Sequence, residues 1–474
     1  MQATSHDFKD NARQALGDRN LEAALTILKR DFAGRRSAAA ARLPEFEQLR
    51  DEGRDIKNHV LTYLDLYLET FERNVTALGG TVHWAADAAE ARDQVLAVCR
   101  AAGATTVTKG KSMIAEEIGI NEHLEENGIT PVETDLGEYI IQLRHETPSH
   151  IIAPAIHLIK GQVAETFRAS HRELDAARPL DEPRQLCDEA RQLLRPKFLA
   201  ADVGITGANF LVAETGSSVI VTNEGNGDLT QNLPRVHIVL ASLEKIVPTL
   251  EDLSTLLRLL ARSATGQECS TYTTVSSGPR RPGDSDGPEE YHVVLLDNGR
   301  SAMLGTEFQD ILRCIRCGAC FNHCPVYGAV GGHAYGWVYG GPMGSVLTPQ
   351  LVGVAEAGNL PNASTFCGRC ESVCPMRIPL PKMMRHWRER EFERHLQPGR
   401  HRVALKLWAF LAANPPLYRI ASEVGAALLG WSGRSRGRFR ALPLASGWTN
   451  GRDMPAPEGK TFMAIWAERQ KRKR

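Results

Sequence analysis

Seven of the ten cysteines fall between residues 314 and 374, and their spacing is the strongest chemical signal in the sequence. The first four form Cys314-x2-Cys317-x2-Cys320-x3-Cys324, with Pro325 directly after them. This is the spacing of a bacterial ferredoxin loop. Soft thiolate ligands suit iron, and the two-residue gaps let three sulfurs converge on one cluster. The sequence therefore predicts an iron–sulfur ligand loop here.

A second motif, Cys367-x2-Cys370-x3-Cys374-Pro375, lacks a first cysteine, and alignment with the first motif puts Ser364 at that position. In two-cluster proteins the last cysteine of each loop binds the other cluster. The exchange predicts two [4Fe–4S] sites. The first takes Cys314, Cys317, Cys320 and Cys374, and the second takes Cys324, Cys367 and Cys370.

The fourth ligand of the second site stays open at this point. Ser364 through its oxygen, a water or substrate, a residue from elsewhere or from a partner, and a three-iron form are the alternatives. Ser364 equally fits a turn or helix-cap residue, and Cys269 is the remote thiol candidate. Cys99 and Cys187 fit helix faces as packed thiols. Zinc is the competing metal, because paired C-x2-C motifs also bind zinc.

Residues 328–344 lie between the two motifs and hold seven glycines among aromatic residues. Glycines let the backbone pass close to a cluster and donate N–H groups to sulfur. The segment lacks the G-x-G-x-x-G order, and we recognise no flavin or nicotinamide site. His333 within it is a possible ligand, although a surface or hydrogen-bonding role is the commoner one.

The predicted secondary structure that must position these cysteines changes along the chain. Residues 18–78 have helical periodicity, and strand and helix candidates then alternate, which indicates an α/β sheet. The strand candidates are residues 81–84, 105–108, 132–136, NFLVAE, SSVIVTNEG, HIVLAS and YHVVLLD. Residues 276–290 are expected to form an exposed loop. We predict an N-terminal helical segment (1–60) packed on an α/β domain (61–300), a two-cluster module (303–382) and a C-terminal extension (383–474).

Polar residues near the predicted strand ends are candidates for a substrate site, because ligands gather at the carboxyl ends of strands in α/β sheets. Cations could bind a carboxylate there, and acids could move protons. Solvated loop charge is the alternative interpretation. The candidates are Lys109, Lys111, Glu214 and Glu224, with Ser112, Thr215, Asn223 and Asn226 beside them.

The overall charge of the 474-residue chain is zero, but the charge is segregated. Residues 377–474 hold 21 Lys and Arg against 7 Asp and Glu. Such a tail suits an acidic partner or a membrane surface better than sequence-specific binding of nucleic acid. The composition excludes a disordered or collagen-like chain, and no stretch reaches the roughly 18 apolar residues of a membrane span. Without a leader-like N-terminus we expect a cytoplasmic protein, with peripheral contact at the inner face of the membrane as an option.

Several segments resemble the lactate-utilisation protein B family, the iron–sulfur subunit of a bacterial three-protein L-lactate oxidation system. The segments are KGKSMIAEEIGINEHLEENGI, VETDLGEYIIQL, PSHIIAPAIH, ETGSSVIVTNEGN, GGHAYGWVYGGPMG and the two cysteine motifs. The resemblance implies an α/β domain of the sugar-isomerase and CoA-transferase-like (LUD) type. An α-helical two-cluster ferredoxin-like module and a helical basic extension would follow it.

The resemblance also implies a function and partners. The chain would carry electrons in the oxidation of L-lactate to pyruvate, without itself being the site of dehydrogenation. Its partners would be a cysteine-rich subunit and a second, smaller LUD-like subunit, with the electron acceptor unknown. Two alternatives stay open: a metabolite-binding redox sensor, and the iron–sulfur subunit of another 2-hydroxy-acid oxidase such as glycolate oxidase.

Overall fold

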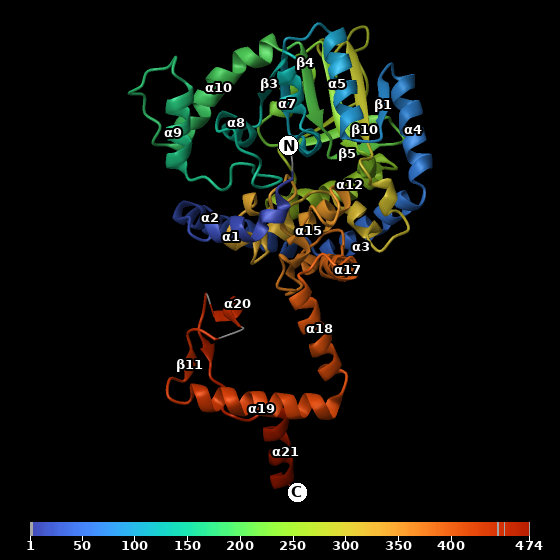
Figure 1. The fold of residues 1–474 in the computed structure, drawn as a ribbon. Helices are drawn as coiled ribbons and strands as arrows, with labels where there is room; N and C mark the ends of the chain where they lie inside the picture. Colours follow the sequence, from blue (N-terminus) through green and yellow to red (C-terminus); the bar gives the residue numbers. More distant parts are fainter. Residues whose placement is uncertain (1–2, 443–444, 450, 474) are drawn as a thin grey trace. The chain divides into compact units, whose positions relative to one another are not determined.

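The computed structural model describes residues 3–442, 445–449 and 451–473 (Figure 1). The chain divides into two compact units, residues 1–390 and residues 391–474. The first unit contains both the α/β region and all ten cysteines. The cysteine-bearing segment therefore packs within the same unit as the α/β region.

A six-stranded sheet forms the centre of the α/β region, and every neighbouring pair in it is parallel. In spatial order the strands are β1 (Thr81–Ala85), β10 (Glu290–Leu296), β7 (Val236–Ser242), β4 (Val203–Gly207), β2 (Thr106–Gly110) and β3 (Thr130–Glu133). Parallel strands need crossover connections, which the alternating helices provide. The expected α/β architecture is confirmed.

Helices cover both faces of this sheet. The helices α5 (Ala88–Ala101), α6 (Met113–Ile118) and α7 (Ile120–Glu126) share a core with Val294 and Leu296 of β10. The intervening Val293 and Leu295 pack on the other face with α4 (Leu64–Ala77). On that face α11 (Asn226–Asn232) lies so close to β4 that a Cβ on Gly204 would stand 1.8 Å from the Thr230 carbonyl oxygen. Both faces are buried, as a parallel sheet requires.

Two of the expected strands belong to a separate, smaller sheet. Its order is β8 (Ile246–Val247), β5 (Phe210–Val212), β6 (Ser217–Thr222) and β9 (Tyr272–Ser276). The helix α12 (Leu250–Ala264) follows β8. The strand expected at residues 132–136 is shorter than predicted, because β3 ends at Glu133. Asp135 then accepts the N–H groups of Gly137 and Glu138 and starts α8 (Leu136–Leu143).

A helical lobe lies beside β3. It consists of α8, α9 (Lys160–Ser170) and α10 (Pro183–Ala200), which share a separate buried core with Val132 of β3.

The N-terminal helices do not pack only on the α/β region, as we had expected. The helices α1 (Phe8–Ala15) and α2 (Arg19–Ala41) contact the cysteine-bearing segment, whose short helices include α13 (Ala319–Asn322) and α14 (Tyr327–Val330). The next helix, α3 (Phe46–Thr62), packs on α12. Apolar residues of α2 and α3 share one core with residues of the cysteine-bearing segment. The first 60 residues therefore form part of the wall around the cysteines.

The cysteine-bearing segment is helical, as expected. After α13 and α14 it forms α15 (Gly341–Leu351), α16 (Arg369–Ser372) and α17 (Leu380–Glu393). The seven-glycine stretch spans α14 and the start of α15, and most of its residues are buried.

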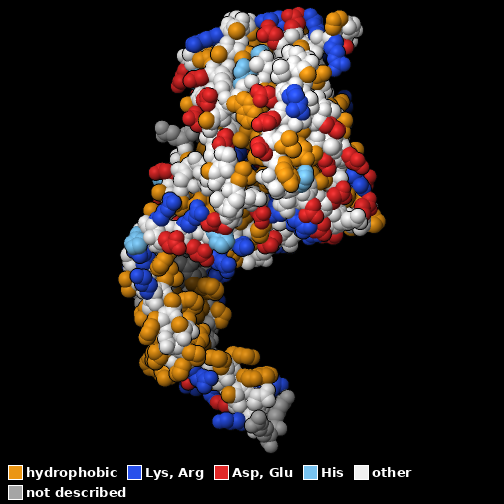
Figure 2. All heavy atoms as spheres, turned by 90° about the vertical axis from the view of Figure 1, so that its right-hand side faces the viewer, with side chains coloured by type: hydrophobic (Ala, Val, Ile, Leu, Met, Phe, Trp, Pro, Cys, Tyr) orange, Lys and Arg blue, Asp and Glu red, His pale blue; other side chains and the backbone are white. Residues whose placement is uncertain are grey.

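The second unit is helical and exposes much apolar surface. It contains α18 (Gly399–Ala412), α19 (Pro415–Gly433), α20 (Ser446–Thr449) and α21 (Phe462–Lys473), with a short ribbon of β11 (Arg438–Phe439) and β12 (Met454–Pro455). Figure 2 shows hydrophobic side chains gathered over this unit, and Trp408 and Trp431 are 63% and 78% exposed. Among the described residues, no helix is both long and apolar enough to cross a bilayer.

Candidate functional site

The structure brings four thiols together around one small cavity, which we call the thiol cavity. Cys314, Cys317 and Cys320 come from the first motif, and Cys374 comes from the second. Apolar side chains complete its wall, namely Ile151, Ile315, Met343, Met376, Ile378 and Leu380. The exchange between motifs had predicted this grouping of one distant cysteine with three near ones.

The backbone of the first motif turns its N–H groups toward sulfur. Arg316 and Gly318 both have positive φ angles, 58° and 69°. Arg316 donates its backbone N–H to the Cys314 sulfur at 3.4 Å. Hydrogen bonds of this kind stabilise negative charge on a metal-bound thiolate.

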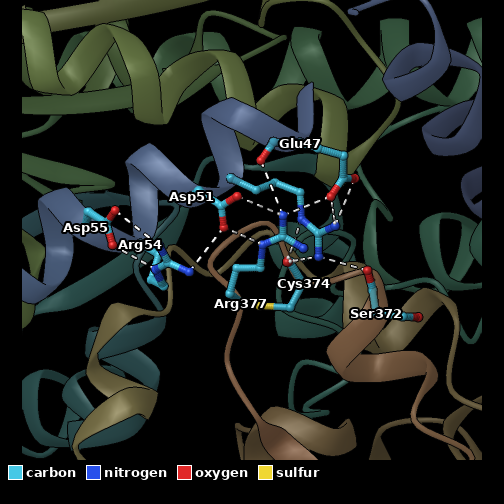
Figure 3. Close-up of polar contacts among 8 residues, drawn as sticks. Glu47, Asp51, Arg54, Asp55, Ser372, Cys374 and Arg377 are labelled. Carbon is cyan, nitrogen blue, oxygen red and sulfur yellow. Dashed lines mark hydrogen bonds and ion pairs between the residues drawn. The ribbon is translucent and has the colours of Figure 1, made fainter. Parts of the chain in front are cut away.

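The backbone at Cys374, which carries the fourth thiol of the cavity, is bonded to the N-terminal helices, and Figure 3 shows its contacts with α3. Arg50 of α3 is buried, and its guanidinium donates to the Cys374 carbonyl oxygen at 2.7 and 3.1 Å and to the Ser372 carbonyl oxygen at 2.8 Å. Arg36 of α2 donates to the Val373 carbonyl oxygen at 2.7 Å. The Cys374 carbonyl oxygen also accepts the Arg377 N–H at 3.2 Å, so the two arginines add side-chain donors to the backbone of the second motif.

The three remaining thiols of the two motifs lie near one another. Cys324 and Cys370 are buried, whereas Cys367 is exposed. Burial, and then the charges of Cys324 and Cys367, raise the pKa of Cys370 to about 12. The pKa of Cys367 is lowered, chiefly by the backbone N–H of Arg369. The second group is therefore closer to solvent than the first.

Ser364 occupies the position that Cys314 has in the first motif. Phe366 and Gly368 repeat the positive φ angles of Arg316 and Gly318, at 53° and 77°. Phe366 donates its backbone N–H to the Ser364 hydroxyl oxygen at 3.1 Å. In the first motif the Cys314 sulfur accepts the equivalent hydrogen bond from the Arg316 N–H. The two loops thus share one backbone conformation with oxygen in place of sulfur.

Tyr335 is a residue near both groups that the sequence did not single out. Its side chain is fully buried, and its hydroxyl has no hydrogen-bond partner in the described part of the chain. Burial, and then the charge of Cys324 among others, raises its pKa well above the usual value, with Cys320 and Cys370 contributing. Its O–H is therefore available to donate to a group held by these cysteines.

A second cavity, of about 150 Å3, lies at the carboxyl ends of the parallel strands, and we call it the strand-end cavity. Three of the candidates from the sequence line it: Lys111, Ser112 and Asn223. Ile151 lines both this cavity and the thiol cavity, so the two adjoin. Arg316, from between two cysteines of the first motif, is also part of its wall.

At this cavity Lys111 is paired with carboxylates. Its Nζ lies 3.2 Å from Asp135 Oδ2 and 3.4 Å from Glu224 Oε2, so Glu224 is also drawn to this edge. Glu138 lines the cavity too, and burial followed by the charge of Glu133 raises its pKa well above the ordinary value.

Lys109 was predicted to be a substrate-binding cation in a loop, but the structure places it elsewhere. It lies inside β2, its side chain is fully buried, and its ammonium pairs with Glu116 at 2.5 Å and Glu133 at 2.7 Å. Burial alone would lower its pKa, but these carboxylates outweigh burial and raise it. Lys109 therefore links β2 to the neighbouring strand β3 and to α6, and it does not line the strand-end cavity.

The other three strand-end candidates are also absent from the lining of this cavity. The Glu214 carboxylate accepts the N–H of Leu250, at the start of α12, at 2.7 Å. Thr215 follows it, with a buried hydroxyl that finds no partner among the described residues. Asn226 is buried in α11.

The predictions for the three isolated cysteines and for His333 can be compared with their positions in the structure. Cys99 is buried, as expected, but the prediction of a packed thiol at Cys187 was wrong, because that residue lies on the exposed side of α10. Cys269 is exposed and lines a surface groove that contains none of the seven clustered cysteines. His333 hydrogen-bonds to the Thr147 carbonyl oxygen at 2.7 Å, the commoner of the two roles considered.

A network of buried charges that the sequence did not reveal reaches the strand-end cavity through Arg316. Arg300 pairs with Glu117 at 2.6 Å and with Glu244 at 3.2 Å, and Arg316 pairs with Glu244 at 3.1 Å. Lys245 lines the cavity beside them. The only sequence signal for Glu244 and Lys245 is their place just after the strand-like segment HIVLAS, whose carboxyl end faces this edge.

The donor set fits iron–sulfur clusters better than zinc. Among the residues that the structure describes, no three His, Cys, Asp or Glu side chains form a group that could hold one metal ion. Four thiols instead surround a cavity with apolar walls, and N–H groups point at sulfur. A cluster of several atoms needs this wider arrangement, whereas a tetrahedral zinc ion needs ligands at about 2.3 Å.

Three protein-family models match successive stretches of the chain. Residues 68–296 match the LUD domain, residues 310–378 match a 4Fe-4S dicluster domain, and residues 369–471 match the C-terminal region of lactate utilisation protein B. The dicluster match covers both cysteine motifs. The chain is thus an iron–sulfur protein of the two-cluster [4Fe–4S] type.

Curated relatives match along almost the whole length. Lactate utilization protein B of Bacillus licheniformis is 41% identical, and the match covers 100% of this chain and 99% of that protein. Lactate utilization protein B of Bacillus velezensis is 42% identical over 98% of both chains. An uncharacterized electron transport protein of Escherichia coli, YkgF, is 40% identical over 99% of this chain and 98% of its own. The chain therefore belongs to the lactate utilisation protein B family.

Proposed function

We propose that this chain is the iron–sulfur electron-transfer subunit of a complex that oxidises L-lactate to pyruvate and supports growth on lactate. The observation that carries the proposal is the convergence of four thiols on one cavity, with three more thiols grouped in the same compact unit. The names of the relatives support lactate as the substrate of the system. When bound, two clusters supply one-electron redox chemistry, which a carrier for a two-electron oxidation needs.

The ligand assignment is part of the proposal. Cys314, Cys317, Cys320 and Cys374 hold the first cluster, and Cys324, Cys367 and Cys370 hold the second. Ser364 provides the fourth ligand of the second cluster through its hydroxyl oxygen. The matching backbone turns, and the hydrogen bond that Ser364 and Cys314 each accept from the residue two positions later, support this assignment.

The partners are also proposed. A carrier in whose sequence we recognise no flavin or nicotinamide fingerprint is expected to need another protein to bring it electrons and one to take them away. The expected partners are a cysteine-rich subunit and a smaller LUD-like subunit. The basic excess of residues 377–474 and the exposed apolar side chains of α18 and α19 support protein or membrane contact through the second unit.

Anaerobic reconstitution of the three proteins tests the function. L-Lactate should bleach the visible absorbance of the clusters in the mixture within one turnover, and D-lactate serves as the stereochemical control. The Cys367→Ala and Cys374→Ala variants should each lose this reduction. Clusters that stay oxidised with L-lactate in the complete mixture would reject the electron-transfer role.

A further inference from the structure

Lys245 is a buried ammonium group that the protein leaves without a partner. Its side chain is only 7% exposed, and its Nζ makes no hydrogen bond or ion pair with any described residue. Burial, and then the charge of Arg316, lower its pKa to about 8. An unpaired buried charge costs several kcal/mol, so such groups are normally paired in the functional state.

The neighbouring carboxylates are already engaged. Glu117 is paired with Arg300 and accepts the Tyr339 hydroxyl at 2.6 Å, and Glu244 is shared between Arg300 and Arg316. Two carboxylates thus face four basic side chains, counting Lys245 and Lys57. The excess positive charge lies at the wall of a cavity, where a dissolved anion can reach it.

The other residues that line the strand-end cavity indicate the size and chemistry of the anion that would fit. Asn209 also lines the cavity, and its side-chain oxygen accepts the Val221 N–H, which leaves its NH2 group free among the described residues to donate. The Asp135 carboxylate lines the cavity and would repel a second carboxylate of the ligand. Ile152, Leu240 and Ala261 provide apolar surface. The cavity volume of about 150 Å3 is below the roughly 300–1,000 Å3 of pockets for drug-sized ligands.

We propose that Lys245 and Arg316 form the carboxylate subsite of a binding pocket for a small 2-hydroxy or 2-oxo monocarboxylic acid. The pocket lies between the carboxyl ends of the parallel strands and the first cysteine motif. The 2-hydroxy or 2-oxo oxygen of the bound acid would face the side of the cavity formed by Lys111, Asp135 and Glu138. The choice of lactate and pyruvate as probes rests on the proposed function, whereas the subsite itself rests on the contacts above.

Direct binding to the full-length, cluster-loaded chain tests the pocket without any electron transfer. Calorimetric titration should show binding of L-lactate and pyruvate, and much weaker binding of the dicarboxylate succinate and the uncharged analogue lactamide. Lys245→Met should weaken lactate and pyruvate binding about 10- to 150-fold, the loss expected for one charge-assisted hydrogen bond. Lys245→Arg should retain most of the affinity.

Thermal unfolding separates this role from simple charge balance of the nearby cluster. Because Lys245 has no protein partner, Lys245→Met should raise the unfolding midpoint of the acid-free protein with iron and sulfide content unchanged. Lys57→Met is the control. Lys57 is also fully buried, but its ammonium donates to the Glu244 and Ile246 carbonyl oxygens, so that variant should lower the midpoint and still bind acid.

Two results would overturn the proposal. One is a wild-type chain that binds neither acid at millimolar concentration. The other is a Lys245→Met variant that binds as wild type, whether or not it loses iron or stability. Acid binding in the absence of cluster reduction by the three-protein mixture would reject the electron-transfer function and leave the pocket standing.

Discussion

The two cysteine groups have the same local backbone but different surroundings. The first has four thiols around a small cavity with apolar walls, and buried arginines of the N-terminal helices bond the backbone at its last cysteine. The second has three thiols, one of them exposed, and a serine at the first position. Spacing therefore determines how each loop turns, whereas the rest of the chain determines how protected each site is.

Replacing one cysteine in each group should have the largest effects on iron content and stability, and the effect on stability should differ most between the two groups. Cys374→Ala should remove roughly half of the iron, the share of one cluster in two, and destabilise the whole first unit, because this thiol lies in the core shared with α2 and α3. Cys367→Ala should remove iron from the second site alone. Iron and sulfide analysis with thermal unfolding measures both. Equal loss of stability would contradict the distinction.

Removal of iron should follow the order of exposure. A chelator, under anaerobic conditions with mild oxidant, should take iron from the second group before the first, because Cys367 is exposed and none of the four cysteines of the first group is. Stopped samples examined by electron paramagnetic resonance would show the order. Faster loss from the four-thiol site would break the comparison.

Arg50 is expected to contribute to the protection of the first site. Arg50→Met leaves the Cys374 and Ser372 carbonyl oxygens without these donors, which should cost about 1–3 kcal/mol of unfolding free energy. Arg54→Met is the matched control on the same helix: its partners Asp51 and Asp55 are exposed, so the change should stay within about 1 kcal/mol. Denaturant unfolding of the loaded proteins measures the difference, and equal costs would remove Arg50 from the account.

Ser364 should have the smallest effect on stability and a specific effect on spectra. Ser364→Cys and Ser364→Ala should each change unfolding free energy by no more than about 0.5 kcal/mol, as partly exposed substitutions usually do. Both should alter the resonance signal of the second cluster and leave the first unchanged. Unaltered spectra from both variants would show that Ser364 is only a turn residue.

The sequence was most informative where the signal is local. Cysteine spacing indicated both motifs and the exchange of Cys374, and alternating hydrophobic patterns indicated the α/β sheet. It was least informative where a charge meets a distant partner. Arg50 has the pattern of an ordinary helix charge, yet it reaches a carbonyl 324 residues away.

Two lysines also show that the sequence does not reveal which charges are paired in the folded protein. Lys109 was expected at a substrate site, but strand alternation turns it into the protein, where two carboxylates pair with it. Lys245 attracted no attention in the sequence, and it is the one of the two that lines a cavity without a partner. Whether a charge is paired depends on tertiary contacts that no local pattern encodes.

Mössbauer spectroscopy of the iron-57-loaded, anaerobically purified chain tests the central claim most directly. We expect two unequal sets of signals, one from a cluster with four thiolate ligands and one containing an iron with a non-thiolate ligand. The second set should change in Ser364→Cys, and the first should not. Two indistinguishable all-cysteine clusters in the wild-type protein would contradict the account.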